Sequence, residues 1–275
     1  MRLDIGHRTD IGRRRDHNED FLGVYQPDID VETAHRGLLF VVADGMGGYA
    51  AGEVASRTAV EAVKQAYYGD LFSDLEDALT RALTTANDMV VQEANRDAER
   101  AGMGTTIAVA VLRGNELVAA NVGDSRVYVI RKSEIQQLTH DHSWVAELLA
   151  VGKITPEEAM RHPMRNVVTR SLGGRPQVDV EVYPRFRVEP GDAILVCSDG
   201  LWGMVPGEKI LQIIDSLSAQ AAADALIAAA NEAGGVDNIS AIVCRVLGDP
   251  TDSDTDRTEM IDPLEIQDTQ PISRP

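Results

Sequence analysis

Four short acidic segments stand out because each pairs an aspartate or an acid cluster with a loop at the end of a predicted strand. An Asp-Gly step after an apolar strand places a short carboxylate at the edge of a sheet, and the glycine lets a backbone carbonyl or a water approach an ion closely. Hard cations such as Mg²⁺ and Mn²⁺ prefer oxygen ligands of this kind. The segments are Asn18-Glu19-Asp20, Asp44-Gly45-Met46-Gly47-Gly48, Ser198-Asp199-Gly200 and Val236-Asp237-Asn238.

Any one of these segments alone is more typical of a turn than of a metal site. Together they fit two divalent cations about 3.5–4 Å apart that share a bridging carboxylate and a bridging water, a common design for in-line hydrolysis of phosphate esters. Arg15 lies five positions before Asp20. Its guanidinium either grips phosphate oxygens in a bidentate manner or is one of three adjacent arginines on a solvated loop, and the residues leave both readings open.

The overall charge of the chain limits the kinds of partner that it can bind. The chain has 275 residues, of which 44% are hydrophobic, enough for one large globular domain with a sizeable core. Its formal net charge of −18 argues against nucleic-acid binding, because phosphate backbones select for basic surfaces, and it repels an anionic membrane. An acidic protein that acts on a phosphorylated substrate needs bound cations to invert the local potential.

The two cysteines, Cys197 and Cys244, lie inside the apolar runs AILVCSD and SAIVCRV and are expected to be small core residues. Neither is followed by arginine six positions later, the arrangement that a thiolate-based phosphatase needs. The N-terminus has no signal-peptide pattern, and no run of about eighteen apolar residues occurs. We therefore expect a cytoplasmic protein without membrane insertion, and a monomer.

The segments that must position these acids switch between strand-like and helix-like patterns. Apolar β-branched runs predict buried strands, and apolar residues at steps of three and four predict amphipathic helices. The runs 105–112, 117–122 and 127–130, with a turn at Gly114-Asn115, look like a β-meander. Further strands are predicted at 37–43, near 177–187, at 193–197 and at 239–246. A first helix should follow the glycines of the segment Asp44-Gly45-Met46-Gly47-Gly48 and end at about residue 66. Further helices are predicted at 74–100, 143–151, 155–160, 208–216 and 219–232.

Runs of strands and runs of helices without strict βαβ alternation favour an α+β domain with mostly antiparallel sheets over residues 1–248. The two helices within 143–160 interrupt the strands and predict an insertion over one end of the sheet. From Asp249 onward the chain has eight acidic residues, two arginines and no core-forming periodicity. This composition predicts an acidic disordered tail at 249–275.

Ten landmarks, in order over about residues 4–247, resemble the PP2C-like, metal-dependent serine/threonine phosphatases in their bacterial form. Ten ordered matches are very unlikely to arise by chance. The landmarks are Arg15-Asp16-His17-Asn18-Glu19-Asp20, Ala43-Asp44-Gly45-Met46-Gly47-Gly48, Ala51-Gly52-Glu53, Gly102-Met103-Gly104-Thr105-Thr106, Val122-Gly123-Asp124-Ser125-Arg126, His140-Asp141-His142-Ser143, Gly152-Lys153-Ile154-Thr155, His162-Pro163, Ser198-Asp199-Gly200-Leu201 and Asp237-Asn238.

The resemblance implies a sandwich of two mostly antiparallel β-sheets flanked by helices, with a small helical flap at about 142–172 beside the active site. It implies hydrolysis of phosphoserine and phosphothreonine in proteins with two tightly bound Mn²⁺ or Mg²⁺ ions. Asp44 would bridge the two ions, with the Gly45 carbonyl on the first. Asp20, Asp199 and Asp237 would surround the second.

Three further roles follow from the resemblance alone. Glu19 would act mainly through a metal-bound water, and Arg15 would hold the substrate phosphate. Asp124 matches the position that helps to hold a weaker third metal in related enzymes. It is also a turn aspartate that caps the predicted meander, and that structural contribution stays open beside the metal role.

One departure concerns the acid that protonates the leaving alkoxide. Some relatives carry a histidine directly after the Asp-Gly pair, where this chain has Met46, which cannot donate a proton. The proton must then come from a metal-bound water or from another group. His17 and His142 lie nearby in the motifs, although a surface or structural role suits a histidine better.

Two alternatives remain beside protein dephosphorylation. A catalytically silent, phosphatase-like binding module should lack one or more of the metal aspartates, whereas all four are present here. A related hydrolase of small phosphoesters would use the same site, since specificity depends on the shape around the flap. The resemblance further implies phosphorylated proteins as partners, including a cognate serine/threonine kinase. The tail threonines, open to phosphorylation, are Thr251, Thr255, Thr258 and Thr269.

Overall fold

The computed structural model describes residues 1–27, 34–47, 51–70 and 73–248. The acidic tail at 249–275 with its threonines, and Gly48 of the first Asp-Gly segment, lie outside the described residues. Within the described ranges, none of the helices combines the length and the apolar character that a membrane span requires.

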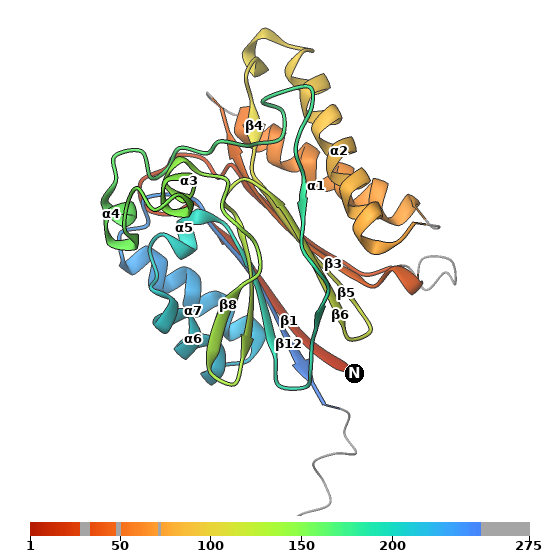
Figure 1. The fold of residues 1–275 in the computed structure, drawn as a ribbon, viewed down its shortest axis with the longest axis vertical. Helices are drawn as coiled ribbons and strands as arrows, with labels where there is room; N and C mark the ends of the chain where they lie inside the picture. The colour runs from red at the N-terminus through yellow and green to blue at the C-terminus, as the bar shows by residue number, and fades with distance from the viewer. Residues whose placement is uncertain (28–33, 48–50, 71–72, 249–275) are drawn as a thin grey trace, which may run out of the picture.

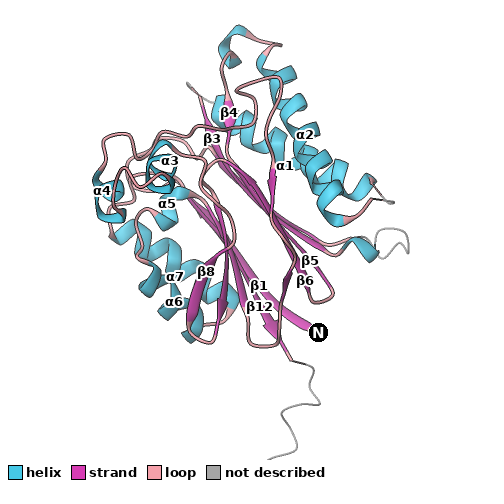
Figure 2. Cartoon of the chain, viewed as in Figure 1, coloured by secondary structure: helices cyan, strands magenta, loops and turns pink. Residues whose placement is uncertain are grey.

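Two β-sheets form the centre of the molecule, and every strand pair in the described residues is antiparallel (Figures 1 and 2). The first sheet has the order β1 (Arg2–Asp10), β12 (Ile239–Leu247), β11 (Ala193–Cys197), β7 (Arg126–Arg131) and β8 (Glu134–Gln137). The second has the order β10 (Phe186–Arg187), β6 (Glu116–Val122), β5 (Ile107–Arg113), β3 (Leu38–Met46) and β2 (Asp20–Tyr25), with β4 (Gly104–Thr105) on β3 and β9 (Glu181–Val182) on β6.

Helices cover the outer face of each sheet (Figures 1 and 2). Two long helices pack on the second sheet: α1 (Ala51–Gly69) and α2 (Leu75–Ala94). The C-terminal helices lie on the first sheet: α5 (Asp199–Trp202), α6 (Gly207–Ser216) and α7 (Ala219–Glu232). The remaining helical segments are α3 (Trp144–Ala150), α4 (Pro156–Arg161) and the 3₁₀ turns η1 (Ala34–Arg36) and η2 (Ala98–Arg100). The expected α+β sandwich of two antiparallel sheets flanked by helices is confirmed.

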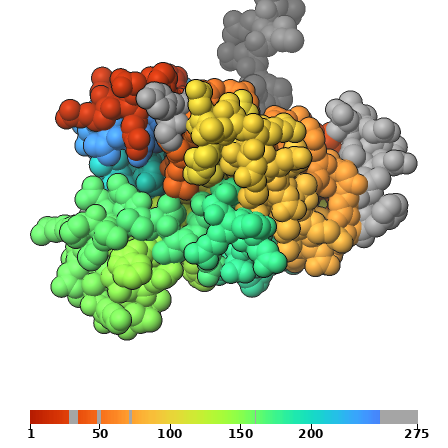
Figure 3. All heavy atoms as spheres, turned by 90° about the horizontal axis from the view of Figure 1, so that it is seen from above, coloured from red at the N-terminus to blue at the C-terminus, as the bar shows by residue number. Residues whose placement is uncertain are grey.

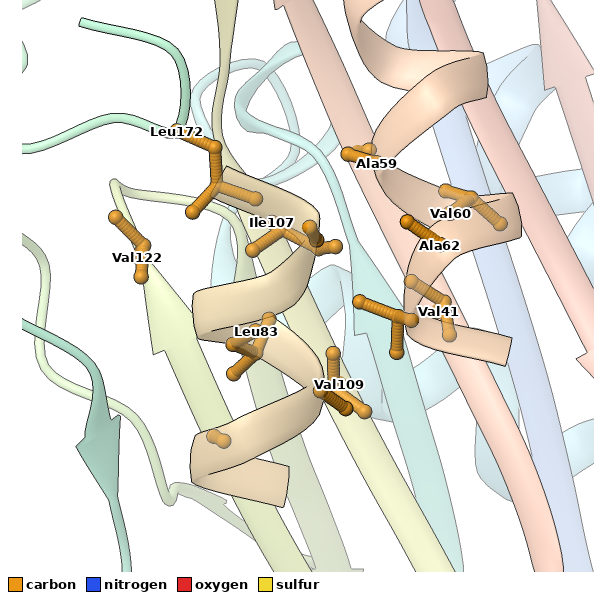
Figure 4. Packing of buried hydrophobic residues seen from close by; sticks show 14 of the residues in the cluster. Val41, Ala59, Val60, Ala62, Leu83, Ile107, Val109, Val122 and Leu172 are labelled. Atoms are coloured by element: carbon orange, nitrogen blue, oxygen red, sulfur yellow. The ribbon is translucent and has the colours of Figure 1, made fainter. Parts of the chain in front are cut away.

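Three apolar layers explain the apolar strand runs. Phe40 and Val42 of β3 face the layer between the sheets, whereas Leu39 and Val41 face α1 and α2. A strand that is buried on both faces reads as a continuous apolar run, because successive side chains point to opposite faces. Figure 4 shows Val41 beside the helices in the layer under α1 and α2.

Both cysteines are free and buried, as expected. Cys197 belongs to the layer under α6 and α7, and Cys244 to the layer between the sheets. The thiols therefore fill core space in two different layers.

The predicted meander is wrong in its last strand. Strands β5 and β6 pair with each other, but β7 pairs with β11 and β8 in the other sheet. The turn at Gly123 has a φ of 107°, in the region that glycine adopts readily, and there the chain leaves one sheet for the other. Because β7 is apolar on both faces, its periodicity does not reveal which neighbour it pairs with.

The helix predictions are confirmed with two corrections, both in α2. Helix α2 begins after the N-cap Asp74 as expected, but it ends at Ala94, short of Arg100. Met89, expected on the inner face, is 39% exposed. The predicted helices in the 142–172 segment are also found: Ser143 caps α3, and Thr155 and Glu158 form a capping box at α4. In Figure 3 this segment, drawn in green, projects at one edge of the molecule.

Candidate active site

Two predicted metal ligands face each other across neighbouring strands. Asp20 begins β2, and Asp44 lies near the end of β3 as its direct antiparallel partner. Residues paired in this way carry their side chains on the same face, about 5 Å apart at Cβ. Asp20 is only 5% exposed. The register of one strand pair thus places a buried carboxylate opposite a partly buried one.

The first sheet supplies two more acids at the same end. Asp199 begins α5 directly after β11, and Asp237 lies in the loop before β12. The charge of Asp199 acts on both Asp20 and Asp44, and so does that of Asp237. The four predicted aspartates therefore converge where the two sheets meet, although they come from distant parts of the chain.

Burial of these carboxyls has a clear electrostatic consequence. Burial, and then the charge of Asp199, raise the pKa of Asp20 to about 7. Burial and the charge of Asp237 raise the pKa of Asp199 to about 6. The pKa of Asp44 is raised well above its ordinary value by burial and by the charges around it. Such a cluster of acids calls for a compensating cation.

Unpartnered oxygens test whether these residues suit a divalent cation. Asp20 Oδ2 accepts a hydrogen bond from Ser198 Oγ at 2.8 Å, whereas its buried Oδ1 has no hydrogen-bond partner in the described structure. Asp199 Oδ1 is buried without a partner as well. Buried polar atoms normally have partners, and carboxylate oxygens are the ligands that hard cations take. The residues present therefore fit Mg²⁺ or Mn²⁺.

The described residues do not yet form a finished ligand set. No three His, Cys, Asp or Glu side chains among them already converge as ligands on a single point. Asp237 instead accepts a hydrogen bond from Arg15 Nη2 at 2.8 Å. Side-chain rotations are therefore needed before all four aspartates can share the same ions.

Arg15 is positioned at the edge of this cluster. Its side chain is 49% exposed, and its ion pair with Asp237 spans the N-terminal loop and the loop before β12. The hydrogen bond to Asp237 raises the pKa of the guanidinium, and the charges of Asp44 and Glu19 act in the same direction. A partly exposed ion pair stabilises a fold very little. Arg15 can therefore give up Asp237 for an anionic ligand.

Asn238 fixes the loop that carries Glu19, a role that the sequence analysis missed. Its Oδ1 accepts a hydrogen bond from the backbone N–H of Glu19 at 2.8 Å. Its Nδ2 donates to the backbone oxygens of Ile11 and His17, both at 2.9 Å. A polar residue directly before an apolar strand was the available signal. Asn238 thus joins the two acidic loops through three partly buried hydrogen bonds.

Two glycines allow β3, α1 and Glu19 to approach closely. A Cβ on Gly45 would lie 2.1 Å from the backbone oxygen of Gly52. A Cβ on Gly52 would lie 2.7 Å from the Glu19 carboxyl carbon. Both positions therefore require glycine for steric reasons.

Asp124 lies in the turn between β6 and β7 and is almost fully buried. Burial, followed by the charge of Asp199, raises its pKa well above the ordinary value. Its backbone oxygen accepts a hydrogen bond from Trp202 Nε1 at 2.9 Å. The Arg126 guanidinium lies 3.4 Å from the centre of the Trp202 ring. Asp124 is therefore part of the same electrostatic cluster and is held from its backbone side.

The two candidate proton donors differ in their surroundings. His17 is exposed and lies two positions before Glu19, whose pKa is raised mainly by burial. His142 is 5% exposed, and both of its ring nitrogens contact other groups, namely the Gly123 N–H and the Glu181 carboxylate. His142 is therefore engaged in the structure and is not placed to protonate a leaving group.

The raised pKa values predict how the metal-free protein responds to pH. In the unfolded chain these carboxyls titrate near pH 4, whereas in the folded state Asp199 and Asp20 titrate at about 6 and 7. Their contribution to stability is complete below pH 4 and is lost as the pH rises through 6 to 7. Bound cations remove this loss, because they stabilise the ionised carboxylates.

We therefore expect the increase in melting temperature on adding Mn²⁺ to chelated protein to be larger at pH 8 than at pH 6. Thermal unfolding with Mn²⁺ or EDTA at both pH values measures this difference. Buried His142 has a lowered pKa, which affects both samples alike and cancels. An equal increase at both pH values would contradict the prediction.

Comparison with known proteins agrees with this geometry. A family model described as protein phosphatase 2C matches residues 13–233. The chain belongs to the protein phosphatase 2C family. It is 40% identical over 243 residues to the serine/threonine phosphatase stp of Listeria welshimeri, which covers 86% of this chain and 93% of that protein.

Two solved structures resemble the whole described fold. The serine/threonine phosphatase Stp1 of Staphylococcus aureus is 34% identical, with a TM-score of 0.82, over 90% of this chain and 96% of that one. The catalytic domain of the phosphatase PstP, solved in complex with two manganese ions, is also 34% identical. Its TM-score is 0.77, over 90% of this chain and 99% of the other.

Proposed function

We propose that this protein hydrolyses phosphoserine and phosphothreonine in other proteins with two divalent cations, Mn²⁺ or Mg²⁺, at the carboxylate cluster. The observation that carries the proposal is the cluster of aspartates at the end of the molecule where the two sheets meet. Two of these aspartates, Asp20 and Asp199, each have a buried carboxylate oxygen without a hydrogen-bond partner among the described residues. The two manganese ions in the related PstP structure support the same choice of cation.

The ligand roles expected from the resemblance suit the positions of the residues. In this proposal Asp44 would hold both ions, with the Gly45 carbonyl on the first and Asp20, Asp199 and Asp237 on the second. Glu19 would act through a bound water, and Asp124 would help to hold a weaker third ion.

The reaction needs an attacking water, charge stabilisation and a proton for the leaving group. When bound, the cations acidify a water for in-line attack on phosphorus and offset the negative charge of the phosphate. Ser198 Oγ orients Asp20 through its 2.8 Å hydrogen bond. Arg15 leaves Asp237 and binds phosphate oxygens with its planar fork. Because Met46 cannot donate a proton, the leaving alkoxide would take its proton from a water held at the site or from another group.

Release of phosphate from a phosphothreonine peptide in the presence of Mn²⁺ or Mg²⁺ tests the proposal. We expect turnover with metal. A folded protein that releases no phosphate but still binds the peptide would instead be the catalytically silent binding module. That alternative is not favoured, because all four metal aspartates are present and their charges act on one another.

Replacement of Arg15 tests the phosphate-binding role separately. We expect Arg15→Ala to raise KM for the peptide about 10- to 100-fold, since hydrogen bonds to charged groups contribute about 1.5–3 kcal/mol. Arg15→Lys should recover only part of this loss, because a lysine lacks the bidentate fork. The neighbouring exposed Arg14 provides the matched control, Arg14→Ala, which should leave KM unchanged. Equal effects of Arg15→Ala and Arg14→Ala would reduce the role of Arg15 to general charge.

The biological partners are part of the same proposal. The family resemblance supports phosphorylated proteins as substrates, among them a cognate serine/threonine kinase, and action as a monomer in the cytoplasm. The 142–172 segment, beside the site, is proposed to be the flap that shapes substrate choice.

A further inference from the structure

His142 and Gly123 form a reciprocal pair of hydrogen bonds. The backbone N–H of His142 donates to the Gly123 oxygen at 2.9 Å, and the Gly123 N–H donates to His142 Nδ1 at 3.1 Å. Because Nδ1 accepts a hydrogen bond, the neutral ring carries its proton on Nε2, which lies 2.8 Å from Glu181 Oε2. Both polar groups of the Gly123 backbone are thus bonded to one histidine.

A buried polar network surrounds this pair. Asn121 is fully buried, and its Nδ2 donates to the oxygens of Gly123 and His140 at 3.1 and 2.8 Å. The Tyr183 hydroxyl donates to Asn121 Oδ1 at 2.8 Å. A fully satisfied buried network holds one arrangement of its members. The position of His142 is therefore well defined.

The Gly123 turn is in turn packed against the strand end that carries Asp44. A Cβ on Gly123 would lie 2.6 Å from Thr106 Cβ, so the two backbones are close. The Thr106 N–H donates to the Asp44 oxygen at 2.9 Å. His142, Gly123, Thr106 and Asp44 thus form a continuous series of contacts.

His142 also lies where the 142–172 segment closes on itself. Its backbone oxygen accepts a hydrogen bond from the Thr169 N–H at 2.8 Å, and the next residue, Ser143, pairs with Val168. At the other end of the segment, Leu172 exchanges two backbone hydrogen bonds with Thr105. Both ends of the segment are therefore anchored beside metal-site residues.

We infer that His142 is a positioning residue, which sets the Gly123–Asp124 turn through its Nδ1 and so holds the Asp124 carboxylate ready for a divalent cation. The inference rests on the proposed metal site. Groups that orient a metal ligand typically change metal affinity about 10- to 100-fold when they are removed. His142 should therefore control the affinity of the Asp124 site without touching substrate.

Trp202 offers a direct readout, because its Nε1 donates to the Asp124 oxygen. The chain has two tryptophans, and Trp144 is exposed, so Trp144→Phe leaves Trp202 as the sole tryptophan, which is excited selectively at the red edge of protein absorption. Paramagnetic Mn²⁺ quenches this fluorescence when it binds beside Asp124, and also when it binds at Asp199, which lies at the start of the same helix as Trp202. The quenching phase at the higher Mn²⁺ concentration therefore reports the weaker Asp124 site. A Mn²⁺ titration in the Trp144→Phe background reports binding without any turnover.

Three substitutions separate the contacts of His142. His142→Ala removes both ring contacts, His142→Asn keeps an acceptor near the Nδ1 position, and His142→Gln places its amide near the Nε2 position instead. His140→Ala is the matched control. His140 contacts the same Glu181 carboxylate at 3.0 Å, but its side chain is 76% exposed and has no contact with Gly123.

We expect His142→Ala and His142→Gln to raise the Mn²⁺ concentration at the midpoint of the weaker quenching phase about tenfold. His142→Asn should raise it less, and His140→Ala should leave it unchanged. Equal midpoints for His142→Ala and the parent would overturn the inference, and so would an equal shift in His140→Ala. If His142→Ala does not fold, the test is the difference in Mn²⁺ midpoint between His142→Asn and His142→Gln. Equal midpoints for these two variants would overturn the inference. An inactive parent protein would refute the proposed function, while the quenching comparison would still judge His142.

Discussion

Replacing Asp44 by asparagine should lower kcat on a phosphothreonine peptide by at least about 10³-fold, which corresponds to about 4 kcal/mol of transition-state stabilisation. Asp44 is the carboxylate proposed to bridge both cations, and it faces Asp20 directly across two strands. Asparagine keeps the shape but cannot supply the bridging negative charge. Steady-state kinetics at saturating Mn²⁺ measure the loss.

The same substitution should not weaken the metal-free fold. Burial, together with the charges of Asp20 and Asp199, raises the pKa of Asp44, so its ionised form is unfavourable in the absence of a cation. In EDTA at pH 8, Asp44→Asn should therefore melt at the same temperature as the parent or higher. Thermal unfolding by circular dichroism measures this.

Cys197→Ala provides the control for a rival chemistry. It removes a buried thiol from the layer under α6 and α7, which should cost about 1 kcal/mol of stability but leave turnover intact. Full activity in Asp44→Asn, or loss of activity in Cys197→Ala while the protein remains folded, would contradict the two-cation mechanism.

Removal of divalent cations should abolish activity entirely, and Mn²⁺ or Mg²⁺ should restore it. Asp20 and Asp199 each hold a buried oxygen without a partner, and burial raises the pKa of both carboxyls. Without cations the site has neither an acidified water nor positive charge to offset the phosphate. Phosphate release after chelation and after addition of each metal measures the effect.

The fold itself should survive chelation. The three apolar layers lie between the sheets and under the helices, and they do not depend on the acids. Circular dichroism in EDTA should therefore retain the spectrum of the metal-loaded protein. Activity that persists after exhaustive chelation would indicate a metal-independent mechanism.

Local pattern was sufficient for elements with a strong apolar signal. The strand expected at 193–197 is β11, and the helix expected at 219–232 is α7, each with the predicted bounds. The order of the acidic motifs also predicted the four aspartates whose charges act on one another in the structure. Apolar periodicity is a property of neighbouring residues, so it can be read directly from the chain.

Elements with weak apolar content were missed. Strand β1 lies at the edge of its sheet, and all of its residues except Gly6 are exposed or only partly buried. Strand β8, with the sequence EIQQ, forms the opposite edge. Edge strands need few buried side chains, so the sequence contains little signal for them.

The sequence by itself determined which residues are acidic, which segments are apolar and which family motifs occur in order. Only the tertiary structure decided that β7 joins the other sheet, that Asp20 faces Asp44, and that His142 is bonded to Gly123. The physical reason is that periodicity specifies which face of an element is apolar but not which partner covers it. Hydrogen bonds and pKa shifts likewise depend on residues that are neighbours in space but can lie more than two hundred positions apart in the chain.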